Sequence, residues 1–139
     1  MAEEQTPMIQ TITTILPVEN IEPSIAFWEA IGFSRNEEVP EADGSDKLGF
    51  IIFKSGKTEV MYQTFVSMRG DYDPFSGETT ASPTLLFITV ADLDAVINAL
   101  AAYPVTMERR NTFYGADEIG YREPGGHSIT FAQFGSTPK

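Results

Sequence analysis

Glu59 is the side chain in this sequence with the clearest capacity for chemistry. It lies in the run T-E-V-M-Y-Q, residues 58–63, where alternation predicts a strand with Glu59 on the face opposite Val60 and Tyr62. A carboxylate on a sheet face can act as a base, ligate a metal ion or pair with a cationic ligand. Glu59 is therefore the first candidate for a functional residue.

The scarcity of other reactive residue types excludes most kinds of active site. The chain has no cysteine, which excludes a disulfide framework, a thiolate zinc site and a cysteine nucleophile. It has one histidine, His127, so one pocket cannot collect two histidines and a carboxylate from a single chain. No serine-histidine-acid spacing, P-loop or glycine-rich dinucleotide turn is present. His127 follows a Gly-Gly turn and shares the alternation of Ile129, which predicts a solvated turn residue, with a ligand contact or a pH-sensitive group as the alternative.

Alternation divides the predicted strands into two faces. One face is almost wholly apolar and is expected to pack beneath helices: Ile12, Leu16, Val60, Tyr62, Leu86, Ile88, Val90, Ile129 and Phe131. The other face mixes hydroxyls, one carboxylate, one amide and large apolar groups: Thr11, Thr13, Ile15, Glu59, Met61, Gln63, Leu85, Phe87, Thr89, Ser128, Thr130 and Ala132. Small-molecule pockets have this composition, so a solvent-accessible concavity is predicted, with an ordinary wet sheet face as the alternative. Phe50, Phe113 and Tyr114 are expected to line or flank it.

The elements that position these faces occur twice along the chain. A strand over 8–20 leads into a helix that Asn20 can cap, with Pro23 in its first turn and Gly32 at its end. A second strand and helix follow from residue 83, with Asp92 as the cap, and residues 18–21 and 90–93 lie 72 positions apart, since 90 − 18 = 72. Further strand candidates follow each helix, and Gly56 is echoed by Gly126, so each half reads β-α-β-β-β.

Residues 1–139 are thus expected to form a single α+β domain of two similar modules. The first module covers about 8–65, a linker about 66–82 and the second module about 83–134. The linker shows no sustained periodicity, and its Tyr72 and Phe75 are predicted either to cover a pocket or to pin the loop to the surface.

The composition limits the partners of this domain. With 42% hydrophobic residues and a length of 139, the chain can bury a core of its own. The formal charge of −11 disfavours nucleic acid and anionic lipid surfaces, and no segment is apolar enough to span a membrane, so a cytoplasmic location is expected. The acidic balance fits either ordinary solubility or attraction of a cationic ligand.

Two segments resemble the glyoxalase and bleomycin-resistance (vicinal oxygen chelate) superfamily. The first, residues 15–33, reads I-L-P-V-E-N-I-E-P-S-I-A-F-W-E-A-I-G-F, and the second, residues 114–134, reads Y-G-A-D-E-I-G-Y-R-E-P-G-G-H-S-I-T-F-A-Q-F. They are similar to the family's opening strand and helix and to its closing hairpin, whose D-P-x-G turn is here Glu123-Pro124-Gly125-Gly126. The resemblance implies two βαβββ modules that form a curved eight-stranded mixed sheet, with the helices on the convex face.

The resemblance also locates four positions that hold a divalent metal in the family's enzymes. They fall on Thr13, Glu59, Leu85 and Thr130. Glu59 alone among them has a side chain that ligates such a metal at ordinary strength. No metal or other cofactor is therefore expected.

The leading hypothesis is a metal-independent binding protein of the bleomycin-resistance type, which sequesters a toxic or antibiotic compound, aromatic or cationic, without changing it. Its ligand-binding residues are predicted to be Thr13, Glu59, Met61, Leu85, Phe87, Tyr114 and Thr130. The alternative is a glyoxalase-type lyase or isomerase with Glu59 as base or metal ligand, and a third possibility is a dimerising scaffold. Whether the chain is an enzyme stays open. The resemblance implies a homodimer, with the cleft within one chain or across two.

Overall fold

The computed structural model describes residues 7–71 and 84–135. Within these ranges the elements follow in the order β1 (Ile15–Val18), α1 (Glu22–Ala30), β2 (Ser34–Pro40), β3 (Leu48–Ser55), β4 (Thr58–Thr64), α2 (Phe65–Asp71), β5 (Leu85–Thr89), α3 (Leu93–Ala99), β6 (Val105–Asn111), β7 (Asp117–Arg122) and β8 (Ser128–Gln133). The predicted roles of Tyr72 and Phe75 lie outside the described residues. No described helix has the length and apolarity needed to cross a membrane.

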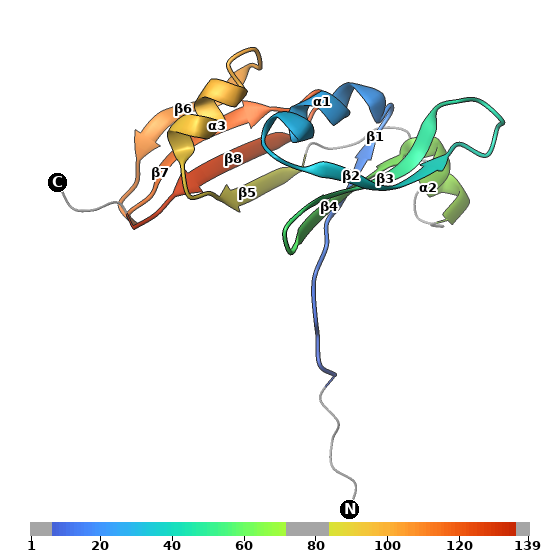
Figure 1. The fold of residues 1–139 in the computed structure, drawn as a ribbon, viewed down its shortest axis with the longest axis horizontal. Helices are drawn as coiled ribbons and strands as arrows, with labels where there is room; N and C mark the ends of the chain where they lie inside the picture. Colours follow the sequence, from blue (N-terminus) through green and yellow to red (C-terminus); the bar gives the residue numbers. More distant parts are fainter. Residues whose placement is uncertain (1–6, 72–83, 136–139) are drawn as a thin grey trace, which may run out of the picture.

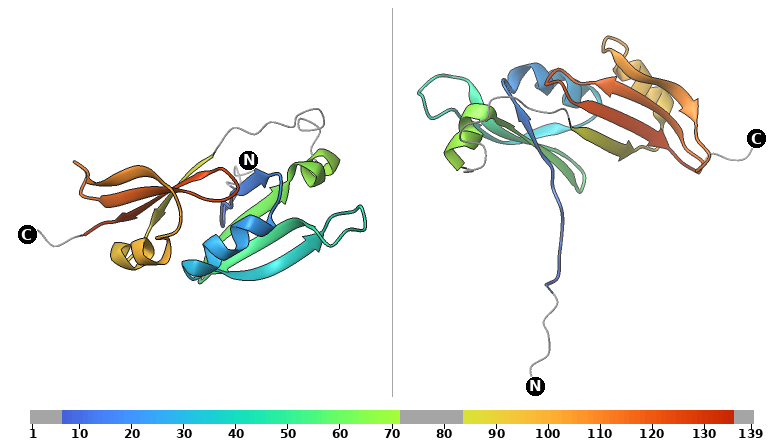
Figure 2. Two further views of the ribbon diagram at one scale, coloured as in Figure 1. Left: turned by 90° about the horizontal axis from the view of Figure 1, so that it is seen from above. Right: turned by 180° about the vertical axis from the view of Figure 1, so that it is seen from behind.

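The eight strands form two sheets of identical topology. The first has the order β1-β4-β3-β2 and the second β5-β8-β7-β6. In each sheet the first strand pairs with the last in parallel, and the remaining pairs are antiparallel. The sheets lie side by side, with α1 over the first and α3 over the second (Figures 1 and 2). The predicted α+β fold of two βαβββ modules is confirmed, and its eight strands hydrogen-bond as two four-stranded groups.

One hydrophobic core joins the two modules beneath the helices. The fully buried Trp28 of α1 contacts the rings of Phe27, Phe33, Phe53 and Tyr62. Side chains of the second module belong to the same cluster: Leu93, Val96, Leu100, Ile119, Tyr121, Ile129 and Phe131. Because each module buries its helix-facing strand residues into this shared core, the two halves form one folded unit.

The predicted core position of Ile12 is wrong. β1 begins at Ile15, and Ile12 precedes it with 91% of its surface exposed. Figures 1 and 2 show the segment before β1 leaving both sheets. The alternation pattern predicted a buried side chain only if the first strand included Ile12. The strand begins three residues later, so no helix covers Ile12.

Local signals placed most of the helix ends and turns correctly. Asp92 caps α3 by accepting a hydrogen bond from the Ala95 N–H at 3.1 Å, and Pro23 lies in the first turn of α1. Asn20 does not cap α1, whose N-cap is Ile21 with no side-chain hydrogen bond. Gly56 and Gly126 both have positive φ, +60° and +99°, in the turns that precede β4 and β8. Their equivalence supports the internal repeat.

The first part of the predicted linker is helical. α2 covers Phe65–Asp71 and is anchored by the buried Met68. Figure 1 shows α2 beside the hairpin of β2 and β3. The absence of periodicity in this stretch did not indicate a helix, because one short helix with a single buried anchor leaves no repeating pattern.

Candidate functional site

The predicted site residues divide into two groups, one with each module. Group A consists of Glu59 and Met61 of β4 and of Thr13, which precedes β1. Group B consists of Leu85 and Phe87 of β5, Thr130 of β8 and Tyr114, which lies in the loop between β6 and β7. Strand register fixes the neighbours inside group B, since Phe87 lies opposite Thr130 in the β5 and β8 ladder. Each sheet therefore carries a half of the predicted site.

Group A borders a groove of about 580 Å³ that contains both acidic and basic side chains. Thr13 and Glu59 line it together with Lys54 and Lys57. Lys54 Nζ lies 4.0 Å from Glu59 Oε2, and the Glu59 side chain is 29% exposed. A partly exposed ion pair at this distance contributes little to stability. The charge of Glu59 is thus balanced in part by its own strand neighbours.

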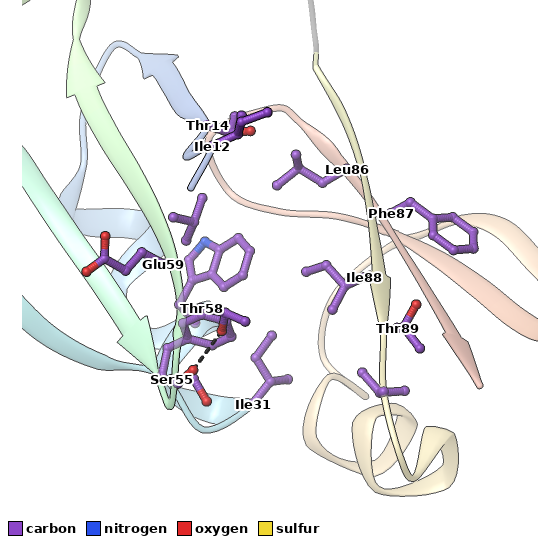
Figure 3. A pocket seen from close by; sticks show the side chains of 14 residues that line it. Ile12, Thr14, Ile31, Ser55, Thr58, Glu59, Leu86, Phe87, Ile88 and Thr89 are labelled. Atoms are coloured by element: carbon purple, nitrogen blue, oxygen red, sulfur yellow. Dashed lines mark hydrogen bonds between the residues drawn. The ribbon is translucent and has the colours of Figure 1, made fainter. Parts of the chain in front are cut away.

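A second cavity, of about 530 Å³, lies between the two modules. Leu86 and Ile88 point into it from β5 (Figure 3). Glu59 and Phe87 also line it, but the carboxylate of Glu59 and the ring of Phe87 point away from it to opposite sides. The space is enclosed mainly by side chains of the core face. Within one chain, groups A and B do not face each other across this cavity.

Tyr114 of group B contacts a buried carboxylate, Glu118, that sequence reasoning missed. Glu118 is 1% exposed and accepts hydrogen bonds from Arg110 Nε at 3.1 Å and from the Tyr114 hydroxyl at 2.8 Å. The rings of Tyr114 and Phe87 each lie about 6 Å from the ring of Phe134, at 6.1 and 6.2 Å. The prediction that Glu59 is the one ionisable group on this face is therefore wrong. The alternation of Glu118 with Ile119 in the closing hairpin was the available signal.

The prediction that His127 is a solvated turn residue is wrong. His127 is 1% exposed, and its Nδ1 accepts a hydrogen bond from the Thr84 N–H at 2.8 Å. Its Nε2 therefore carries the proton and donates to the Pro17 carbonyl at 2.8 Å. Pro17 belongs to β1 and Thr84 immediately precedes β5, so the imidazole joins the two modules. Its sequence position at a strand start gave no sign of this, because the partners come from distant segments.

Glu123, in the same turn, forms a second polar connection between the modules. Its Oε1 accepts from the Ser24 hydroxyl at 2.9 Å, the Tyr62 hydroxyl at 2.6 Å and the Gly125 N–H at 2.9 Å, in a 1% exposed position. Its Oε2 accepts from the His127 N–H at 2.7 Å. Four donors stabilise a carboxylate that has no cationic partner among these contacts. The turn thus holds the modules together and leaves no free group for catalysis.

Tyr62 is expected to stay protonated at alkaline pH, where exposed tyrosines with a pKa of about 10 ionise. Burial raises the pKa of Tyr62 well above that value, and the Glu123 carboxylate raises it further. The unfolded chain then releases this proton at lower pH than the folded chain, so stability falls as pH rises above about 10. Tyrosinate absorbance should show a late ionisation that coincides with loss of the circular dichroism signal.

Tyr62→Phe is the control, because it removes the contribution of Tyr62 to this late ionisation. Tyr121, whose pKa burial also raises, should still titrate late in that variant. Ionisation of all five tyrosines near pH 10 in the folded protein would contradict the expectation.

The donor set does not fit a divalent metal. Thr13, Leu85 and Thr130 contribute no carboxylate or imidazole, and among the described residues no group of three or more histidine, aspartate or glutamate side chains could hold a metal ion. Glu118 is engaged by Arg110 and Tyr114. We therefore derive no chemical step through a metal from these residues.

Comparison with known proteins identifies the relatives of this chain. The sequence model described as "Glyoxalase/Bleomycin resistance protein/Dioxygenase superfamily" matches residues 9–131. No curated protein sequence matches the chain significantly.

Solved structures with the same fold include proteins of different activity. A lactoylglutathione lyase from Agrobacterium tumefaciens is similar with a TM-score of 0.70 and 15% identity, over 92% of this chain and 96% of its own. A glyoxalase/bleomycin resistance protein/dioxygenase from Nocardioides has a TM-score of 0.69 and 18% identity, over 96% and 91%. A bleomycin resistance determinant encoded on the transposon Tn5 has a TM-score of 0.63 and 17% identity, over 92% and 100%. At these identities the similarity establishes the fold alone.

Proposed function

Because the chain belongs to the glyoxalase/bleomycin resistance protein/dioxygenase superfamily, we propose that it binds a small organic molecule without a metal ion and releases it unchanged. The observation that carries this proposal is the composition of the four positions where the family's enzymes hold their metal. Glu59 is there, but Thr13, Leu85 and Thr130 replace the other ligands. A surface of hydroxyls and apolar groups suits binding better than Lewis-acid chemistry.

The proposed ligand surface combines groups A and B. Leu85 is 77% exposed and Phe87 is 52% exposed in the single chain. Large apolar groups gathered on one face are typical of a binding surface. Sequestration of a toxic or antibiotic compound in the cytoplasm is the biological role that we propose, since it needs affinity and no turnover.

A homodimer would complete this surface. The segment before β1 exposes Met8, Ile9 and Ile12 as well, and each sheet carries only half of the predicted site. A second copy related by a two-fold axis could set group A of one chain against group B of the other and cover these apolar groups. We therefore propose that the binding cleft lies between two chains.

Native mass spectrometry of protein purified gently from cells tests this function. We expect a species of two chains with an organic ligand bound and no stoichiometric metal, because the donor set is poor and the apolar groups are uncovered in one chain. A monomer that binds no compound from a panel of organic molecules would contradict the proposal. So would one tightly held metal ion per chain that is lost in Glu59→Ala.

The rival function is a glyoxalase-type lyase or isomerase, and the position of Glu59 in the groove with Thr13 favours it. Its test is turnover of the hemithioacetal of methylglyoxal and glutathione, with and without added zinc or nickel. We expect no turnover above that of a protein-free control. Turnover by the wild type that Glu59→Gln abolishes, with the fold intact by circular dichroism, would replace the binding function with the enzymatic one.

A further inference from the structure

A cavity of about 720 Å³ lies on the first module, at the opposite end of β4 from Glu59. It is enclosed by the β2 end, the loop that follows it, β3, β4 and α2, and its lining is Val39, Pro40, Glu41, Ala42, Asp43, Phe50, Gln63, Val66, Ser67, Gly70 and Asp71. Its volume is that of a site for a drug-sized molecule. Glu59 and the group B residues are not part of this lining.

The described charged side chains that line this cavity are acidic. Glu41, Asp43 and Asp71 contribute three carboxylates, and no lysine, arginine or histidine is among the described lining residues. Hydrogen bonds from Ser45 lower the pKa of Asp43, and the charge of Lys47 acts in the same direction. The groove at Glu59 differs, because two lysines line it. The first module thus favours a cation in this cavity rather than beside Glu59.

Gln63 adds an uncharged acceptor. It is 3% exposed, and its Nε2 donates to Ser67 Oγ and to Asp71 Oδ2, each at 2.9 Å. Both amide hydrogens are therefore used, and no described residue donates to the carbonyl oxygen. Among the described residues, every fully buried side-chain oxygen has a hydrogen-bond partner. Because the carbonyl oxygen of Gln63 has none, we infer that solvent reaches it through the cavity that Gln63 lines.

The remaining wall is apolar. Phe50 is half-buried beside Gln63 in the ladder of β3 and β4, and Val39 and Val66 are exposed, at 49% and 59%. An aromatic ring next to carboxylates attracts a cation through its face and also stacks on a flat organic body. The cavity therefore offers acceptors and apolar contacts, with no competing cation among the side chains described in its lining.

We propose that this cavity binds a flat organic cation, such as a protonated aromatic amine, with its charge toward Glu41 and Asp71 and its rings against Phe50 and Val39. This inference goes beyond the proposed function, because it adds a binding site that is separate from groups A and B. The carboxylates repel an anion and form no charge-assisted hydrogen bond with an uncharged analogue, so both analogues are expected to bind more weakly than the cation.

Fluorescence titration of the full-length protein with proflavine tests the proposal, with acridone and 9-anthracenecarboxylate as uncharged and anionic tricycles. Proflavine should bind about tenfold or more tightly than either analogue, since charge-assisted hydrogen bonds are specific to it. The double variant Glu41→Gln/Asp71→Asn should weaken proflavine by about tenfold or more, and the exposed Asp43→Asn by about threefold. Glu108→Gln, on β6 of the other module, is the matched control and should bind like the wild type.

Circular dichroism melting verifies that each variant is folded. If the double variant does not fold, the single variant Asp43→Asn still tests the role of the carboxylates. Equal binding of the three tricycles would overturn the inference and leave the proposed function in place. A loss in Glu59→Gln that the cavity variants do not share would also overturn it. If no tricycle binds, this inference fails, while the proposed function is judged separately by native mass spectrometry.

Discussion

Glu123→Ala is expected to lower the free energy of unfolding by about 3 to 5 kcal/mol, because each buried donor left without an acceptor costs about 1 to 3 kcal/mol. The carboxylate accepts from Ser24, Tyr62, Gly125 and His127, and truncation leaves three buried donors and the half-buried Gly125 N–H without this acceptor. Ser24 and Tyr62 belong to the first module, so the loss also weakens its attachment to the second. Because a domain of this size is stable by about 5 to 15 kcal/mol, this change can unfold a large fraction of the chains.

Chemical denaturation followed by circular dichroism measures this effect. Glu108→Ala is the control, since Glu108 is exposed and its loss should change stability by less than about 0.5 kcal/mol. Glu123→Gln should lie between the two, because the amide keeps one acceptor oxygen but turns an NH₂ group toward donors. A denaturation midpoint of Glu123→Ala equal to that of the wild type would show that the four contacts do not hold the modules.

His127→Ala is expected to cost about 2 to 4 kcal/mol of stability. The imidazole satisfies the Thr84 N–H and the Pro17 carbonyl, and its removal leaves both without a partner and opens a cavity in a buried position. The loss should appear as a lower denaturation midpoint with an unchanged slope.

The internal repeat supplies a matched control for this variant. Lys57 follows Gly56 in the first module as His127 follows Gly126 in the second, and Lys57 is exposed. Lys57→Ala should therefore change the stability by less than about 0.5 kcal/mol. If the two variants were equally stable, His127 would be the solvated turn residue that its sequence position suggests.

The contrast between Lys57 and His127 illustrates which features local sequence can predict. Both follow a glycine with positive φ in a hairpin turn, and the turn itself was predictable from glycine's conformational freedom. The burial of the side chain after the glycine was not predictable, because His127 hydrogen-bonds to Pro17 and Thr84, which lie 110 and 43 residues away in sequence. Alternation assigns a face to a residue but not the segments that cover it.

The candidate site also has features that local sequence predicts and features that it does not. The strand faces of Glu59, Leu85 and Thr130 were predictable from alternation, whereas Thr13 precedes β1 and lies on no strand face. The pairing of Glu118 with Arg110 was not, because it depends on the register between β6 and β7, where a shift interrupts the ladder. The cavity lined by Gln63 was not predictable either, because it forms only when α2 packs against the end of β4.

The sequence by itself determined the order of elements within each βαβββ module, the repeat of two modules and the core side chains of β4 and β8, since these follow from strand alternation, glycine turns and the Asp92 cap. Only the tertiary structure decided that Ile12 leaves the sheet, that His127 and Glu123 join the modules, and that three carboxylates border one cavity. The physical reason is range: backbone preferences act over a few residues, whereas burial and ion pairing depend on segments brought together after the chain folds.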